Sequence, residues 1–206
     1  MSKIRLHGSS SGYMEIAPPA AASSATVTLP NSAGEVLLSD GSAASLTSLP
    51  AGQLTGTVVN GRLPTGSFIQ IITDSTTTAV ENTTTSFADT GLSGSITMTD
   101  ASNKVLVIIS QVYRMANATG GQNGGSFRIY RNTTNLDSVP EYLYYHAGSG
   151  PTTKYDYGIH SRHILDTPGT GTHTYKTQTA AYGSGSTVYS QYGSGTSRIT
   201  LVEIKA

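Results

Sequence analysis

Tyrosine is the residue type in this sequence whose number and spacing point to ligand-binding chemistry. The chain contains twelve Tyr, against three Phe and no Trp. A tyrosine presents an apolar ring for stacking and a hydroxyl for hydrogen bonding, which suits polar ligands such as sugars. Five tyrosines crowd into residues 142–157 with one histidine, and others lie beside Gly-Ser-rich turns. The candidate ligand-binding residues are Tyr142, Tyr144, Tyr145, His146, Tyr155, Tyr157, Tyr182 and Tyr192.

The same tyrosines also allow a structural interpretation, in which they pack at strand edges or at contacts between subunits. Residues 182–185 and 192–195 both read Tyr-Gly-Ser-Gly, ten residues apart. They predict two loops that flank a strand over residues 186–191, which contains Tyr189. Both interpretations stay open at the level of sequence.

Catalytic chemistry has less support in the sequence. A glycosidase needs two carboxylates opposed across a cleft, and Asp137, Glu141, Asp156 and Asp166 lie nearest the tyrosines. No recognisable catalytic motif includes them. Residues 8–12 match the Gly-x-Ser-x-Gly nucleophile pattern, but that pattern requires a helix directly after it, which the following Pro-Pro pair prevents. We expect no enzymatic activity, with polysaccharide cleavage through Glu141 or Asp156 as the alternative.

Metal and cofactor binding are not indicated. His160 and His163 are three residues apart on a predicted strand, so their side chains point to opposite faces and cannot share a metal ion. The absence of Cys excludes thiolate ligands and disulfides. A single histidine repeated around a threefold axis would be the remaining metal site. We expect no metal and no cofactor.

Composition limits the classes of partner. Charged residues are 12% of the chain, about half the usual share, and the formal net charge is zero. Lys and Arg are scattered, so no footprint for nucleic acid is present. No run of 18 apolar residues predicts a membrane-spanning helix, and the first residues lack the apolar core of a secretory signal. Ser and Thr number 57, a surface chemistry typical of β-rich extracellular or virion proteins.

Residues 66–206 predict an antiparallel β-sandwich, because short apolar segments recur at regular intervals with Gly, Asn, Asp and Pro between them. No segment has a helical period over three turns. The predicted strands cover residues 67–74, 84–90, 94–99, 104–115, 126–132, 141–146, 158–166, 171–179, 186–191 and 197–205.

The segment 104–114 is the strongest predicted strand, and it is apolar on both faces. Its side chains alternate between two sets: Val105, Val107 and Ile109 on one face, and Leu106, Ile108 and Val112 on the other. A strand with one solvated face should instead alternate apolar with polar. We therefore expect the second face to be covered by a neighbouring copy of the chain. Segment 67–74 predicts the same, with Phe68 and Ile72 opposite Ile69 and Ile71.

The N-terminal third predicts two further parts. Residues 1–45 predict a small β-hairpin module of three or four short strands, at residues 3–7, 13–16, 25–29 and 35–38. They have too little apolar mass for a core of their own, so we expect this module to need trimerisation or docking. Residues 46–65 combine aliphatic side chains with frequent Gly and Pro, which excludes both a helix and a lone strand. We predict an intertwined neck at a threefold axis, with these interface residues: Leu46, Leu49, Leu54, Val58 and Leu63.

A family resemblance supports this division. Residues 48–58 and 60–64 resemble the short shaft segments of bacteriophage tail fibres, which are trimeric. The order of residues 85–92, 104–107, 165–169, 174–176 and 199–204 resembles the C-terminal head domain of phage fibres. The N-terminal module is similar to modules of cyanobacterial phage proteins that connect a fibre to the particle.

The resemblance implies an all-β, jelly-roll-like head that assembles as a homotrimer and contacts host-surface glycan or protein. It also implies a virion protein, assembled in the host cytoplasm and released by lysis, with other virion proteins bound through its N-terminal module. Two alternative functions are also consistent with a virion protein. One is a capsid decoration, cement or head-fibre trimer with a structural role, and the other is a small polysaccharide-degrading tailspike, although such tailspikes usually carry β-helices longer than this head.

Overall fold

The structure is a computed structural model that describes residues 4–16, 58–118, 122–139, 145–146, 153–183 and 185–206. The chain divides into two units, residues 1–56 and 57–206. The predicted strands near residues 25–29 and 35–38 lie outside the described residues, as do Leu46, Leu49 and Leu54 of the predicted neck. None of the described segments forms a helix long and apolar enough to cross a membrane.

The described part of the N-terminal unit is an antiparallel hairpin. Strand β1 (Ile4–His7) pairs with β2 (Tyr13–Ile16), as the sequence predicted. Residues 8–12 form the turn, in which Gly12 has a φ of 75°, a value that favours glycine. Strand β2 follows this turn directly, where a nucleophile elbow would require a helix, so the Gly-x-Ser-x-Gly match lacks that context.

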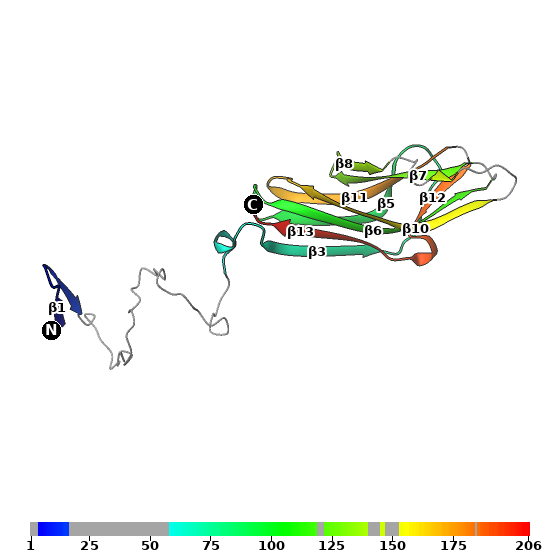
Figure 1. Ribbon diagram of the computed structural model, residues 1–206. Coiled ribbons are helices and arrows are strands. Elements are labelled where there is room, and N and C mark those ends of the chain that lie inside the picture. Colours follow the sequence, from blue (N-terminus) through cyan, green and yellow to red (C-terminus); the bar gives the residue numbers. More distant parts are fainter. Residues whose placement is uncertain (1–3, 17–57, 119–121, 140–144, 147–152, 184) are drawn as a thin grey trace. The chain divides into compact units, whose positions relative to one another are not determined.

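The head, residues 58–206, is a sandwich of two antiparallel sheets (Figure 1). In one sheet, β6 pairs with β10 along one edge and with β13 and then β12 along the other, while β3 pairs with β13 and β4 with β12. Its strands are β3 (Phe68–Thr76), β4 (Val80–Asn82), β6 (Lys104–Asn117), β10 (Lys154–Asp166), β12 (Ser186–Ser190) and β13 (Ser197–Ile204). The predicted β-sandwich is confirmed.

The opposing sheet has the order β5-β11-β7-β8, and β9 pairs with the start of β7. Its strands are β5 (Ala88–Met98), β7 (Asn123–Arg131), β8 (Thr134–Val139), β9 (Tyr145–His146) and β11 (Gly171–Ala181). The two sheets enclose one main cluster of buried side chains between them, formed by Leu92, Ile96, Met98, Val105, Val107, Ile109, Ile129, Tyr175, Ile199 and Leu201. Burying each of the larger aliphatic side chains contributes roughly 1.5–3 kcal/mol.

Strand β5 differs from the prediction, which placed two strands over residues 84–90 and 94–99. Asn82 accepts hydrogen bonds from the backbone and hydroxyl of Thr84, both 2.9 Å long, and so directs residues 83–87 into a loop. The strand then continues through Gly94, where a Cβ would lie 3.2 Å from Ile199 Cγ2. This glycine permits close packing and does not end the strand. Strands β4 and β8 were not predicted.

Strand β3 also departs from its predicted alternation. A register shift opposite Glu203 and Ile204 makes Phe68 the partner of Ile204, while Ile71 pairs with Val202. Paired residues in an antiparallel sheet share a face, so Phe68 lies on the same face as Ile71. The prediction that these two side chains point apart was wrong, because the bulge adds one residue between them.

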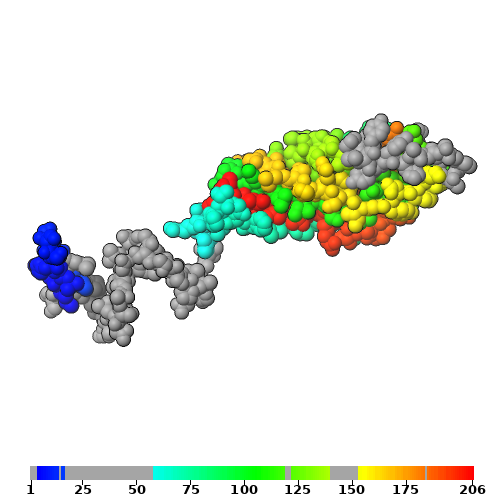
Figure 2. All heavy atoms as spheres, viewed as in Figure 1, coloured from blue at the N-terminus to red at the C-terminus, as the bar shows by residue number. Residues whose placement is uncertain are grey.

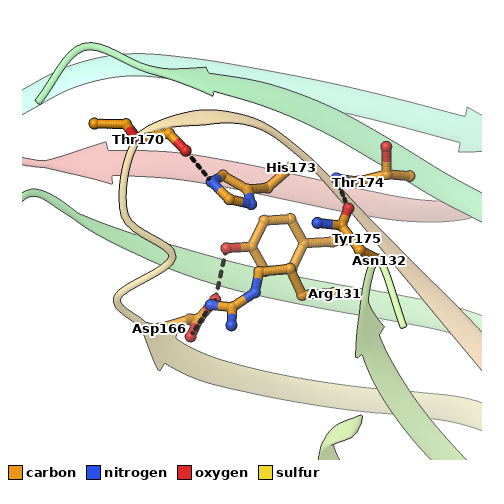
Figure 3. Close-up of polar contacts among 7 residues, drawn as sticks. All are labelled: Arg131, Asn132, Asp166, Thr170, His173, Thr174 and Tyr175. Atoms are coloured by element: carbon orange, nitrogen blue, oxygen red, sulfur yellow. Dashed lines mark hydrogen bonds and ion pairs between the residues drawn. The ribbon is translucent and has the colours of Figure 1, made fainter. Parts of the chain in front are cut away.

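Along one side of the sandwich, polar side chains of the edge strand β10 bond side chains of the opposing sheet (Figure 3). Figure 2 places β10, in yellow, at the surface of the head. Arg131 of β7 forms an ion pair with Asp166 of β10 at 2.7 Å, and the buried Tyr175 hydroxyl donates to the same carboxylate at 2.7 Å. Nearby, Arg162 of β10 pairs with Asp137 of β8 at 2.6 Å. These contacts fix β10 over the opposing sheet.

The end at which the chain enters the head is closed by a buried carboxylate. Glu203 is fully buried and accepts hydrogen bonds from Gln70, Thr99 and Asn103, at 2.6 to 2.9 Å. Burial raises the pKa of Glu203, but these hydrogen bonds together lower it by a larger amount. The pKa of the carboxyl therefore lies below its ordinary value. Two residues further on, the backbone N–H of Lys205 donates to Ser67 O and its carbonyl oxygen accepts from Gly66 N–H, both at 2.9 Å. The C-terminal strand thus ends where residues 58–66 begin the head.

Candidate functional site

The outer face of the six-stranded sheet is apolar towards the entry end. Val105, Val107 and Ile109 point into the core, whereas Leu106 and Ile108 point outwards, as the sequence predicted for β6. Neighbouring strands add apolar side chains to this face, of which Phe68 is 64% exposed, Ile71 58% and Ile108 41%. We call this set the apolar patch: Phe68, Ile71, Leu106, Ile108 and Leu165.

The outer face of the opposing sheet has the opposite chemistry. Its strands carry rows of hydroxyls that bond one another, with Ser95 and Thr174 2.8 Å apart and Thr97 and Thr172 2.7 Å apart. Lys176 and Asp89 form an ion pair there at 2.8 Å. An exposed apolar face is therefore a property of one sheet of this sandwich. Large exposed apolar patches on soluble proteins mark interaction sites.

The far end of the apolar face carries an arginine surrounded by tyrosines. The Arg114 guanidinium lies 3.9 Å from the ring centroids of both Tyr189 and Tyr192, and 5.3 Å from that of Tyr155. Tyr157 completes the group, with its ring 6.1 Å from Tyr155 and 5.7 Å from Tyr192. We call these five residues the aromatic cluster.

Strand register positions this cluster. Tyr157 of β10 and Tyr189 of β12 are both direct partners of Arg114 of β6, so the three side chains form one row across three strands. Two residues along β10, Tyr155 adds a second ring on the same face. The fourth ring comes from η4 (Tyr192–Ser194), a 3₁₀ turn between β12 and β13.

A buried residue fixes the turn that presents Tyr192. Gln191 has a φ of 54° in the left-handed region and is fully buried. Its backbone N–H donates to Val112 O at 2.9 Å, and its side-chain nitrogen can donate to the carbonyl oxygens of Thr90 and Thr78 at 3.0 and 3.1 Å. After the turn, Gly195 packs so closely that a Cβ would lie 2.8 Å from Val112. Tyr192 is thus held in place before any ligand arrives.

Arg114 keeps its charge and is not neutralised by an acid. Burial lowers its pKa, but the hydroxyls of Tyr189, Tyr192 and Tyr157 raise it above the ordinary value. Its Nε is buried without a hydrogen-bond partner. Among the described residues no carboxylate forms an ion pair with Arg114, while Arg5, Arg131, Arg162 and Lys176 each have one. The cluster therefore combines exposed rings with a positive charge.

The structure distributes the candidate tyrosines between two sheets. Tyr155, Tyr157 and Tyr192 come together in the aromatic cluster. Tyr145 and His146 form β9, which pairs with β7 in the opposing sheet, and Tyr182 follows β11 with its N–H bonded to Gly124 O. Tyr142 and Tyr144 lie outside the described residues.

The sequence interpretation did not include Arg114 or Tyr189 among the candidate residues. The outward alternation of β6 was a signal for Arg114. Its neighbours, however, depend on which strands pair with β6, and a single sequence does not supply that pairing.

The structure places three of the four carboxylates of the catalytic alternative. Asp137 and Asp166 are engaged in the ion pairs that join the sheets, Asp156 is half-buried on β10, and Glu141 is not described. His160 is buried and His163 exposed, so the predicted opposite orientation is confirmed. Within the described ranges, no three His, Asp or Glu side chains are grouped as metal ligands.

Comparison with known proteins gives no family. No protein-family model matches the sequence, and no curated protein does. Among solved structures, the chain is similar to dimeric latent PorU from Porphyromonas gingivalis, with 10% identity and a TM-score of 0.29. The match covers 69% of this chain and only 13% of that one. Likeness at this level does not assign a family or a function.

Proposed function

We propose that this chain is the subunit of a homotrimeric bacteriophage tail fibre whose head binds a receptor, a glycan, on the host surface. The observation that supports the proposal is the division of one sheet face into two parts. The apolar patch lies towards the end where the chain enters the head, and the aromatic cluster lies towards the opposite end of β6 (Figure 1). A fibre subunit needs this polarity, with assembly near the shaft and recognition at the tip.

The apolar patch is the part we assign to assembly. Val58 and Val59, which lie within the predicted neck and are the first described residues of the head, are exposed at 55% and 60% and add to the apolar surface at this end. A second copy of the chain is the simplest cover for such a surface, because closed homo-oligomers need no other gene product. The predicted neck residues would then place three heads around one axis.

The aromatic cluster is the part we assign to recognition. Tyr155 and Tyr157 are 55% and 57% exposed, so their ring faces are open to a ligand. Sugar rings stack on such faces, and each single contact is weak. Three linked sites in a trimer raise the overall affinity well above that of one site. The proposed role of the tyrosines is binding, and the proposal includes no enzymatic activity.

The N-terminal unit is the part we assign to attachment on the phage particle. The N-terminal unit would attach the fibre to other virion proteins, and the protein would be part of the virion. The alternative, a capsid decoration trimer, would use the same apolar patch for assembly but has no need for exposed tyrosines around an arginine. This difference favours the tail fibre.

Light scattering on the purified full chain and a glycan array test the proposal together. We expect the mass of three chains and binding to a subset of glycans. A monodisperse monomer would contradict the trimer, and an array without any bound glycan would contradict the receptor role. Imaging of the particle would then distinguish the tail from the capsid shell.

A further inference from the structure

We infer that the aromatic cluster selects an acidic sugar, whose carboxylate, sulfate or phosphate binds Arg114 while its ring stacks on Tyr155 and Tyr157. This inference rests on the proposed glycan-binding function and specifies its ligand class. A neutral sugar needs only the tyrosine rings for stacking, whereas Arg114 among these rings suits a ligand that also carries a negative charge.

The first argument is that Arg114 is held in position before binding. Its guanidinium is stacked between Tyr189 and Tyr192, 3.9 Å from each ring centroid. Two such contacts restrain a side chain that would otherwise lose considerable rotamer freedom on binding a ligand. The planar group has N–H donors in a fork that matches a carboxylate or sulfate. The site therefore presents a fixed anion receptor.

The second argument is that no described carboxylate of the protein forms an ion pair with Arg114. The rows of the sheet place Glu81 beyond Tyr189 on the same face, and it is exposed and makes no ion pair with Arg114. Asp156 lies between the two tyrosines of β10, but strand alternation points it to the other face. The guanidinium contacts tyrosine rings and interacts with tyrosine hydroxyls. An external anion would supply the missing partner.

Arg128 in the opposing sheet also stacks on aromatic rings, but it differs from Arg114 in its hydrogen bonding. Arg128 is stacked over Phe87 at 3.7 Å and lies 4.6 Å from the Tyr130 ring centroid. Its Nε, however, donates to Gln178 Oε1 at 3.0 Å, whereas the Arg114 Nε has no partner. The stacked guanidinium of Arg128 thus has a hydrogen-bond acceptor for its Nε–H within the protein. This makes Arg128 the matched control for a test of Arg114.

The third argument concerns the sugar ring. The rings of Tyr155 and Tyr157 are inclined by 38° and their centroids are 6.1 Å apart, and Tyr192 lies next to them. Together they form an open aromatic surface beside the positive charge. A sugar with an acidic substituent can contact both at once, whereas a small inorganic anion would use Arg114 only. The combination favours an acidic glycan.

Calorimetry with the full chain tests the inference using three probes: trigalacturonic acid, neutral galactotriose and a galactose trimer bearing sulfate. We expect the acidic probes to bind at least about tenfold more tightly than the neutral one, as charge-assisted hydrogen bonds predict. The preference should fall as salt concentration rises. Comparison of the uronate and the sulfate identifies which acidic group the site takes.

Three variants separate the possible outcomes. Arg114→Gln should remove the acid preference, so that the three probes bind with similar affinities, while Tyr157→Ala should weaken binding of all probes and keep the preference. Arg128→Gln should change neither. Equal affinity for acidic and neutral probes, or an acid preference that survives Arg114→Gln, would overturn the inference and leave glycan binding intact. If the wild-type protein bound none of the three probes, the proposed function would be overturned as well. Thermal melts confirm that each variant folds.

Discussion

His160 of β10 stacks on Phe127 of β7, with ring centroids 4.4 Å apart and the planes inclined by only 16°. The two residues come from opposite sheets, and both are buried. The Tyr113 ring also packs on Phe127, edge to face, with the ring centroids 5.4 Å apart. A neutral imidazole fits this apolar environment, whereas an imidazolium does not. The stack therefore ties the position of β10 to the protonation state of one histidine.

We predict that the head loses stability in mildly acidic solution. Burial, reinforced by the positive charge of Arg162 and opposed by Asp137, lowers the pKa of His160 from 6.5 to about 4. The unfolded chain then binds a proton more readily than the folded one, so stability is complete above pH 6.5 and falls as the pH drops towards 4. We expect a loss of about 2 kcal/mol at pH 5.

Urea unfolding at pH 7.5 and pH 5 measures this loss. In His160→Phe the pH dependence should become smaller, because the titrating group is gone. His163→Asn, on the exposed face of the same strand, should retain the full dependence. A wild-type protein equally stable at both pH values would show that His160 accepts a proton without cost.

We predict that Asp166→Asn destabilises the sandwich by about 3 kcal/mol. Asp166 has a side chain only 12% exposed, pairs with Arg131 and accepts the Tyr175 hydroxyl (Figure 3). The variant leaves a largely buried guanidinium without its counter-charge. Asp137→Asn is the control, since its partner Arg162 is 42% exposed and such pairs contribute about 0–1 kcal/mol. Thermal melts should separate the two variants; similar melting temperatures would contradict this ranking.

We predict that Gly158→Ala disturbs the contact between β10 and β6. A Cβ at this position would lie 2.7 Å from the Tyr113 hydroxyl oxygen and 2.8 Å from its Cζ. Tyr113 is itself packed on Phe127, so the ring has little room to move. We expect a loss of about 1–3 kcal/mol, the usual cost of overpacking. Gly61→Ala, which meets nothing within 4 Å, should unfold like the wild type in the same chemical denaturation experiment.

Much of the fold follows from side-chain alternation. The two apolar faces of residues 104–114 predicted a strand with one face in the core, and this is found; the other face points outwards in the single chain, and its cover by a neighbouring copy stays a prediction. The glycines of β5 were misleading, since Gly91 and Gly94 interrupt the apolar pattern without ending the strand. What a glycine does there depends on Ile199 of a distant strand, and no local pattern contains that contact.

The candidate site was predictable only in part. Tyr155 and Tyr157 were predicted as candidate residues, but they lie before the predicted strand 158–166, and they share a face because β10 begins four residues earlier, at Lys154. Their meeting with Arg114 and Tyr189 follows from the register of three strands separated by up to 75 positions along the chain. The bulge in β3 likewise moved Phe68 onto the apolar patch. Register and bulges are tertiary properties, and they decide which side chains form a surface.

We predict that the double variant Ile71→Asp and Ile108→Asp prevents trimer formation. Both side chains lie on the apolar patch and are exposed in the single chain, so the head itself should fold. An unpaired carboxylate in a subunit contact costs several kcal/mol, which lowers association by more than about a hundredfold. Ser95→Asp, on the hydroxyl-lined face of the other sheet, is the matched control. Light scattering should give a monomer for the first and a trimer for the second; two trimers would remove the apolar patch from the interface.

We predict that Tyr157→Ala weakens adsorption to host cells far more than it weakens a single site. One aromatic contact contributes about 1 kcal/mol, or roughly fivefold in affinity per site. If three sites bind together, the loss multiplies towards about a hundredfold in adsorption. Tyr130→Ala, in the opposing sheet, should leave adsorption unchanged. Calorimetry with a monovalent glycan and a cell-adsorption assay measure the two quantities on the same variants. Equal losses in both assays would mean that the heads bind singly, and unchanged adsorption would place the receptor site elsewhere on the head.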